Sequence, residues 1–183
     1  ADLLSQGEHG VDSQVVLVTT SPVLIDAVQA EVERQLSTLS RSEIARKALD
    51  HSLLLLVHDM EEAVALTNAY APEHLILAVR DYNDVKERID HAGSVFLGNW
   101  SCESAGDYAS GTNHTLPTKG YARAYSGLCL DSFMRKMTFQ ELTPEGIRHI
   151  GPAVEQMAEA ECLDAHRMAM TLRRRSVEED ADL

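Results

Sequence analysis

Short apolar runs alternate with amphipathic stretches over the first hundred residues of the chain. The apolar runs are bounded by turn residues and are typical of strands buried in a parallel sheet. The stretches between them carry apolar residues at helical spacing. The predicted strands are 15–18, 52–57, 74–79 and 94–97, and the predicted helices are 2–9, 22–36, 41–49, 59–70 and 83–92. This alternation predicts an α/β fold with a mostly parallel sheet.

Turn chemistry supports several of these boundaries. Ser21 and Pro22 supply an N-cap and a first-turn proline for one helix. Asp59 is placed to cap a later helix, which we expect to run through Tyr70. That helix should stop before Pro72, because a residue that precedes proline is disfavoured in the α-helical conformation.

The pattern changes after residue 97. Residues 98–128 contain five glycines and little apolar periodicity, and so long a stretch without regular structure is usually functional. Farther on, Met137–Leu142 is predicted as a short strand and Pro144–Arg175 as helix, with a break near Cys162 after which Asp164 starts a new helix. We expect an incomplete Rossmann-like α/β domain over 1–128, including a glycine-rich active-site loop, and a mainly helical tail or dimerisation region over 129–183.

Composition and charge narrow the class of protein. The chain has 183 residues and a net charge of −13, which argues against a nucleic-acid partner because phosphate binding requires a basic surface. No apolar stretch approaches the roughly 18 residues of a membrane span, so we expect no membrane association. Three widely spaced cysteines without a CxxC motif favour free thiols in a reducing cytoplasm.

Two short stretches in the first half carry candidate chemistry. Gln6 and His9 are three residues apart, so on a helix they share a face and could bind one ion, although a solvated polar face is the simpler interpretation. Ala71-Pro72-Glu73-His74-Leu75 places a carboxylate beside an imidazole at the entrance to a predicted strand. Such a pair suits proton transfer at neutral pH, but adjacent Glu-His pairs are also common by chance.

Two further stretches lie in the second half. The segment from Gly106 to His114 contains Asp107, and its small residues allow close approach of the backbone to a ligand. It matches neither a Walker A motif nor a GxGxxG fingerprint, so it predicts no phosphate or dinucleotide cradle. Glu161 and His166 are five residues apart and would not share a face of one continuous helix. The expected helix break could still bring both to one site.

Taken together, these stretches closely resemble the histidinol dehydrogenases, the zinc- and NAD-dependent enzymes that complete histidine biosynthesis. The resemblance runs from residue 1 to about residue 176. Its motifs are Leu4-Ser5-Gln6-Gly7-Glu8-His9-Gly10, Ala71-Pro72-Glu73-His74-Leu75, Gly106-Asp107-Tyr108-Ala109-Ser110-Gly111-Thr112-Asn113-His114 continuing to Leu116-Pro117-Thr118, and Glu159-Ala160-Glu161 with Leu163-Asp164-Ala165-His166.

The resemblance implies a set of site residues and an activity. The implied activity is the oxidation of L-histidinol through an aldehyde to L-histidine, with one zinc ion per site and NAD⁺ as co-substrate. Glu73 and His74 match the catalytic acid–base pair of the family. The implied zinc ligands are Gln6, His9, Asp107 and His166, and the implied substrate-binding residues are Gln6, His9, His74, Asp107, His114, Glu161 and His166. No residue of this chain is assigned to NAD⁺.

The family also implies an intertwined homodimer, in which the tail of one subunit completes the site of the other. Family members are considerably longer on the N-terminal side, so we expect this chain to be a C-terminal portion without the part that contacts NAD⁺. Cys102 stands where proline is expected and Cys162 where glycine is expected. Neither change replaces an expected ligand.

Two other functions remain open at this stage. The chain could be a non-catalytic zinc-binding or dimerisation module, or a zinc hydrolase in which Glu73 activates a metal-bound water. The absence of any HExxH spacing argues against the hydrolase.

Overall fold

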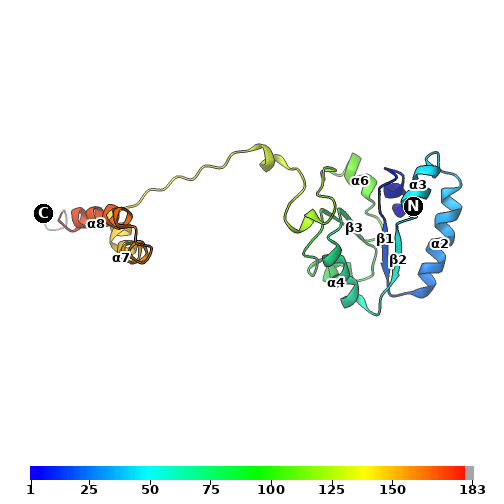
Figure 1. Ribbon diagram of the computed structural model, residues 1–183, viewed down its shortest axis with the longest axis horizontal. Coiled ribbons are helices and arrows are strands. Elements are labelled where there is room, and N and C mark those ends of the chain that lie inside the picture. The colour runs from blue at the N-terminus through cyan, green and yellow to red at the C-terminus, as the bar shows by residue number, and fades with distance from the viewer. Residues whose placement is uncertain (180–183) are drawn as a thin grey trace. The chain divides into compact units, whose positions relative to one another are not determined.

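The computed structural model describes residues 1–179 and divides the chain into two compact units, Ala1–Met134 and Arg135–Leu183 (Figure 1). The strands of the first unit are β1 (Val16–Thr19), β2 (Leu53–Leu56), β3 (His74–Leu77) and β4 (Ser94–Leu97). Its helices are α1 (Asp2–Gly7), α2 (Pro22–Leu36), α3 (Ser42–Leu49), α4 (Met60–Tyr70), α5 (Tyr82–Lys86) and α6 (Glu103–Tyr108), with short 3₁₀ turns at Tyr121–Arg123 and Leu130–Phe133. The second unit holds α7 (Pro144–Ala160) and α8 (Asp164–Glu179). The predicted boundary at residue 128 precedes the observed division.

Two small parallel sheets organise the first unit. Strand β1 pairs with β2, and β3 pairs with β4 in a register that sets His74 opposite Ser94. Helix α2 contacts both β1 and β2, while α1, α2 and α3 pack on one another beside this sheet (Figure 1). The predicted α/β class with parallel strands and a helical C-terminal part is therefore confirmed.

Two small apolar clusters lie in the first unit. Leu4, Leu36 and Ala45 form one buried cluster, in which helix α1 is held against α2 and α3. Val64 and Leu77 belong to a second cluster, which fixes α4 on β3. These clusters anchor α1 and β3, which carry Gln6 and His74.

The strands are less buried than their apolar sequences predict. Leu53, Leu54 and Leu56 of β2 are 46%, 36% and 55% exposed. Parallel strands are normally covered on both faces, whereas this two-stranded sheet leaves these leucines uncovered. The expected fully buried strand at 15–18 is likewise only half-buried over Val16–Thr19.

The predicted boundaries of α4 are close to the observed ones, whereas those of α5 are not. The cap at Asp59 is confirmed, since its Oδ1 accepts the backbone N–H of Glu62 at 2.9 Å, and the helix ends at Tyr70. Helix α5 is much shorter than the predicted 83–92. It ends at Lys86, and Ile89 then donates its backbone N–H to the carbonyl of Lys86 in a tight turn.

The glycine-rich stretch 98–128 is not devoid of regular structure. Helix α6 begins after Cys102, which has extended backbone angles at the N-cap position. Within this helix Gly106 packs tightly, because an added Cβ would lie 2.7 Å from Phe96 and 2.9 Å from Thr112. The glycine therefore allows α6 to lie directly on the β3–β4 sheet.

The second unit is a helical hairpin. Helices α7 and α8 pack together, and the Arg174 guanidinium donates to a Glu155 carboxylate oxygen at 2.8 Å. The predicted helix break is confirmed, because Cys162 adopts a φ of 58° between the helices. That left-handed conformation favours glycine, the residue that the family resemblance leads one to expect at this position.

The predicted strand at Met137–Leu142 is wrong. Within the described residues this segment pairs with no other strand, and Met137 and Phe139 are 66% and 88% exposed. An apolar, β-prone sequence forms a strand only when another strand offers its backbone groups. Across residues 1–179, no helix combines the length and apolar character needed to cross a membrane.

Candidate metal and acid–base site

The end of helix α1 positions Gln6 and His9. Gln6 lies in the last turn of the helix, and the backbone N–H of His9 donates to the Gln6 carbonyl at 3.2 Å. The carbonyl of His9 in turn accepts from the Arg41 guanidinium at 3.2 Å. The His9 ring is exposed, whereas Gln6 Nε2 is buried without a hydrogen-bond partner. Helix α1 ends at Gly7, so His9 lies beyond the predicted helical face and is joined to Gln6 through the backbone at the helix end.

The turn between α4 and β3 positions Glu73 and His74. Ala71 ends α4 in the left-handed conformation, with a φ of 54°. The backbone N–H groups of Gly93 and Ser94 donate to the carbonyls of Pro72 and Glu73, both at 2.9 Å. These bonds fasten the entrance of β3 to β4, so His74 begins the strand on a fixed backbone.

Helix α6 contributes two carboxylates. Glu103 is its first residue and Asp107 follows four residues later, so both side chains lie on one face of the helix. Glu103 is 3% exposed, although glutamate is almost never fully buried without a partner. Asp107 is half-buried.

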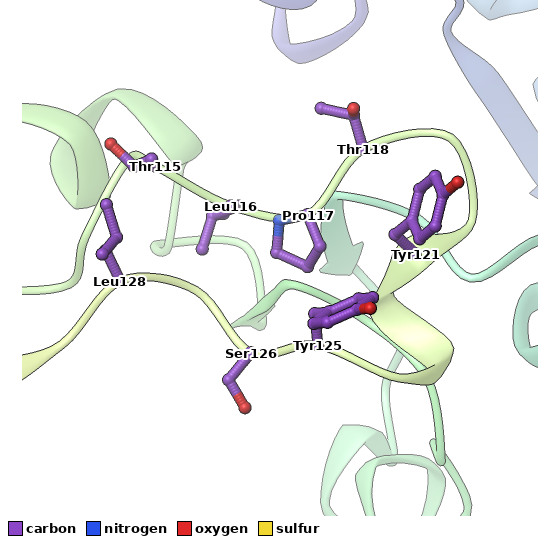
Figure 2. A pocket seen from close by; sticks show the side chains of 8 residues that line it. All are labelled: Thr115, Leu116, Pro117, Thr118, Tyr121, Tyr125, Ser126 and Leu128. Atoms are coloured by element: carbon purple, nitrogen blue, oxygen red, sulfur yellow. The ribbon is translucent and has the colours of Figure 1, made fainter. Parts of the chain in front are cut away.

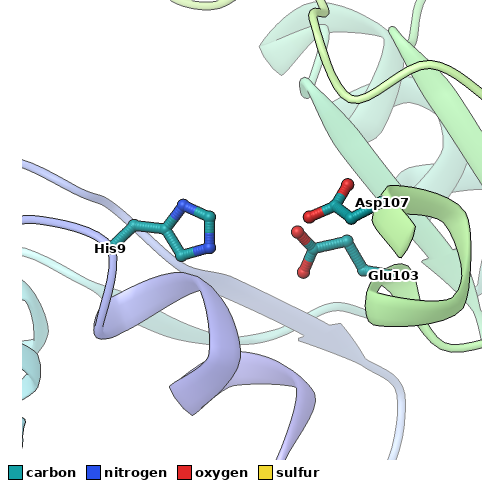
Figure 3. Close-up of side chains that lie close together, drawn as sticks. All are labelled: His9, Glu103 and Asp107. Atoms are coloured by element: carbon teal, nitrogen blue, oxygen red, sulfur yellow. The ribbon is translucent and has the colours of Figure 1, made fainter.

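These elements bring an imidazole and two carboxylates together. His9, Glu103 and Asp107 each offer a ligand atom, and these atoms lie within 4.8 Å of one another. Figure 3 shows the His9 ring extending from the segment after α1 toward the two carboxylates of α6. The set is chemically suited to a divalent metal ion, because imidazole nitrogen and carboxylate oxygen are both zinc donors.

Glu103 also faces the proposed acid–base residue. His74 Nε2 lies 3.8 Å from Glu103 Oε1, with the side chain of His74 11% exposed. Ser5 Oγ donates to the other carboxylate oxygen at 3.3 Å, and the Gln6 side chain also lies next to Glu103. Burial raises the pKa of Glu103, and the neighbouring His74 opposes this shift while the Asp107 carboxylate reinforces it.

Sequence reasoning missed Glu103. The available signal was its spacing from Asp107, because a Glu-x-x-x-Asp pair on a helix presents two carboxylates on one face. The signal is useful only if residues 103–108 are predicted to be helical, and the glycine-rich composition of this stretch argued against a helix.

The structure places the remaining predicted residues outside this cluster. Glu73 is half-buried and precedes His74, and His114 is exposed in the loop after α6. Glu161 and His166 are exposed in the second unit, at the end of α7 and in α8. The His9–Glu103–Asp107 cluster therefore includes two of the predicted zinc ligands and adds Glu103.

Two open pockets lie beside the loop that carries His114. One is lined by residues 115–118 together with Tyr121, Tyr125, Ser126 and Leu128, and the rings of Tyr121 and Tyr125 lie at one end (Figure 2). The backbone N–H of Leu128 donates to the carbonyl of Thr115 at 3.0 Å, which holds these segments side by side. The second pocket has Ser94 and Phe133 among its lining residues. None of the proposed zinc or acid–base residues lines either pocket.

Comparison with known proteins places the chain among related sequences. The family model for histidinol dehydrogenase matches residues 1–174. Histidinol dehydrogenase of Bacteroides thetaiotaomicron is 64% identical over 173 residues, or 94% of this chain and 40% of the relative. The chloroplastic histidinol dehydrogenase of Oryza sativa subsp. japonica is 56% identical over 179 residues, or 97% of this chain and 38% of the relative.

A solved structure of the same family is also similar to this chain. The crystal structure of histidinol dehydrogenase from Elizabethkingia anophelis matches with a TM-score of 0.91 and 55% sequence identity, covering 97% of this chain and 41% of that one. The chain thus spans about two fifths of the length of the relatives it matches. On the strength of the family match and these identities, the chain belongs to the histidinol dehydrogenase family.

Proposed function

We propose that this chain supplies the metal and acid–base part of an enzyme that oxidises L-histidinol to L-histidine, with zinc as cofactor and NAD⁺ as co-substrate. The observation that carries the proposal is the cluster of His9, Glu103 and Asp107, which lies beside His74 in a chain of this family. The location of the protein in the cytoplasm remains a prediction, and the rice and Arabidopsis thaliana relatives are named chloroplastic.

The residues present fit a zinc ion. His9 and Asp107 supply an imidazole and a carboxylate whose ligand atoms already converge. Gln6 lies next to the same cluster and carries a buried amide without a hydrogen-bond partner. We assign the ion to Gln6, His9, Asp107 and His166. When bound, zinc supplies a Lewis acid that can orient nitrogen ligands such as the imidazole and amine of histidinol.

His74 is assigned the proton transfers. It takes the hydroxyl proton of histidinol while the carbon gives a hydride to NAD⁺, which leaves an aldehyde. Glu73 then activates a water that hydrates the aldehyde, His74 takes a second proton, and a second hydride leaves. The balance is one histidinol, one water and two NAD⁺ giving one histidine, two NADH and three protons.

The second unit is assigned to the site of a partner subunit. Glu161 and His166 lie at the junction of α7 and α8, where the break at Cys162 reorients the chain. In an intertwined homodimer these two residues would complete the other subunit's site, with Glu161 and His114 lining the substrate pocket. This arrangement would let Glu161 and His166, which are far along the chain from Gln6 and His9, serve the same kind of site.

Two other functions would give different results in simple assays. A zinc hydrolase would consume its substrate without NADH formation, so absorbance of NADH during turnover separates it from a dehydrogenase. A non-catalytic zinc-binding or dimerisation module would change size in solution with zinc but would bind no histidinol.

Zinc titration of the metal-free 183-residue chain tests the proposed site. We expect a stoichiometric site whose affinity falls at least about tenfold in His9→Ala and in Asp107→Ala. Glu61→Gln is the matched control, because Glu61 is an exposed acidic residue at the start of α4. Equal zinc affinity in His9→Ala, Asp107→Ala and the control would overturn the assignment.

A further inference from the structure

Glu103 is a buried acid for which neither the proposed zinc set nor the proposed acid–base pair provides a role. Its 3% exposure and the neighbouring Asp107 carboxylate both make an ionised side chain costly at this position. A glutamine of the same shape would avoid that cost. The carboxylate therefore calls for an explanation beyond packing.

The contacts of Glu103 divide between its two oxygens. Oε2 accepts the hydroxyl of Ser5 at 3.3 Å, which ties the carboxylate to helix α1. Oε1 faces His74 Nε2 at 3.8 Å, and this nitrogen is buried without a hydrogen-bond partner. Phe96 lies beside the same imidazole, with ring centroids 6.1 Å apart. The carboxylate thus faces an imidazole nitrogen that has no hydrogen-bond partner.

Which nitrogen of a neutral histidine carries the proton is set by the groups that its two ring nitrogens face. A carboxylate accepts hydrogen bonds and donates none, so it favours a proton on the nitrogen that faces it. We propose that Glu103 is a positioning residue that keeps the proton of His74 on Nε2 and leaves Nδ1 as the proton acceptor in the reaction. This inference rests on the proposed function only in making His74 the catalytic base.

Nitrogen-15 NMR of the His74 ring in the metal-free 183-residue chain tests this inference without zinc, NAD⁺ or histidinol. At fixed neutral pH, the wild-type Nε2 signal should be that of a protonated nitrogen and the Nδ1 signal that of a bare one. In Glu103→Gln the two signals should move toward each other, because an amide can either donate or accept. Glu103→Asp should restore part of the difference, and Glu61→Gln should leave it unchanged.

Other results would assign Glu103 a different role. An unchanged His74 spectrum in a folded Glu103→Gln chain would overturn the inference. Loss of zinc from Glu103→Gln together with an unchanged His74 ring would make Glu103 a metal ligand instead. If Glu103→Gln does not fold, Glu103→Asp is compared with wild type instead, because its shorter side chain holds the carboxylate farther from Nε2. A smaller movement of the two signals toward each other is then expected, and no movement would overturn the inference.

The proposed function and this inference can fail separately. A chain that shows the expected His74 signals but binds no histidinol when loaded with zinc would contradict the function alone. A chain that binds histidinol but lacks the expected response in Glu103→Gln would contradict the positioning role alone.

Discussion

His74 Nε2 lies 3.8 Å from Glu103 Oε1, although one residue begins strand β3 and the other begins helix α6. The pairing requires α6 to approach the β3–β4 sheet closely, which Gly106 permits by packing on Phe96. A buried acid thereby meets the imidazole to which the proton transfers are assigned. The proposed chemistry therefore depends on the close packing of α6 on the β3–β4 sheet as well as on His74 and Glu103.

Stability should depend on pH through Glu103. Its pKa is raised in the folded chain, so the folded state holds this proton at pH values where the unfolded chain has lost it. The contribution to stability is fully present below the ordinary glutamate pKa of about 4.3 and is lost as pH rises through the raised value. Glu103→Gln should therefore stabilise the metal-free chain at about pH 7 more than at about pH 4.

Urea unfolding of both chains at the two pH values measures this difference. A Glu103→Gln chain that is less stable than wild type at neutral pH would show that the ionised carboxylate supports the fold, contrary to this account. The same variant is expected to disturb the His74 ring, so a gain in stability would accompany a loss of positioning.

Gly106→Ala should destabilise the first unit. The added Cβ would lie 2.7 Å from Phe96 in the β3–β4 sheet, which forces α6 or the ring to shift. Such overpacking costs about 1–3 kcal/mol of unfolding free energy. Gly7→Ala is the control, because its Cβ would meet Ala45 at an ordinary 3.9 Å. Equal urea midpoints for Gly106→Ala and wild type would show that α6 is not held by this contact.

His74→Ala should separate chemistry from metal binding. Removal of a general base lowers turnover by roughly a hundredfold to ten-thousandfold, while the assigned zinc ligands remain. The measurements are NADH absorbance during turnover of a full-length histidinol dehydrogenase into which this 183-residue segment is built, and the zinc content of the same purified protein. Full activity in His74→Ala would remove this residue from the mechanism, and loss of zinc would make it a ligand.

The partner's contribution to the site can be tested by mixing variants. His166→Ala should weaken zinc binding at least about tenfold, as should His9→Ala. If α8 of one subunit completes the site of another, a mixture of the two variants recovers some intact sites. Zinc titration of the mixture should then detect a tight fraction that neither variant shows alone. Absence of that fraction in a mixture that exchanges subunits would place His166 in the site of its own chain.

The sequence predicted much of the fold because helix-capping residues and apolar periodicity indicated the same boundaries. Asp59 and Pro72 bracket α4, and the alternation of apolar runs with helical periodicity identified all four strands of the first unit. Met137–Leu142 was wrong because strand formation needs a pairing partner, which local sequence does not reveal. The exposure of Leu53 and Leu56 was missed for a related reason, because burial of a strand depends on which elements pack on it, and local sequence does not reveal that.

The site was predicted less completely than the fold. Gln6, His9, His74 and Asp107 were proposed from motifs. The structure brings His9 and Asp107 together and places Gln6 and His74 beside Glu103 of the same cluster. Glu103 was missed because its significance comes from burial against His74, a tertiary relationship that spacing alone does not encode.

The most direct test of the account is a calorimetric titration of the zinc-loaded 183-residue chain with L-histidinol. We predict binding that disappears when zinc is removed by a chelator and that weakens in His9→Ala but not in Glu61→Gln. A folded, zinc-loaded chain that binds no histidinol would contradict the claim that the residues around His9, His74 and Asp107 form the substrate site.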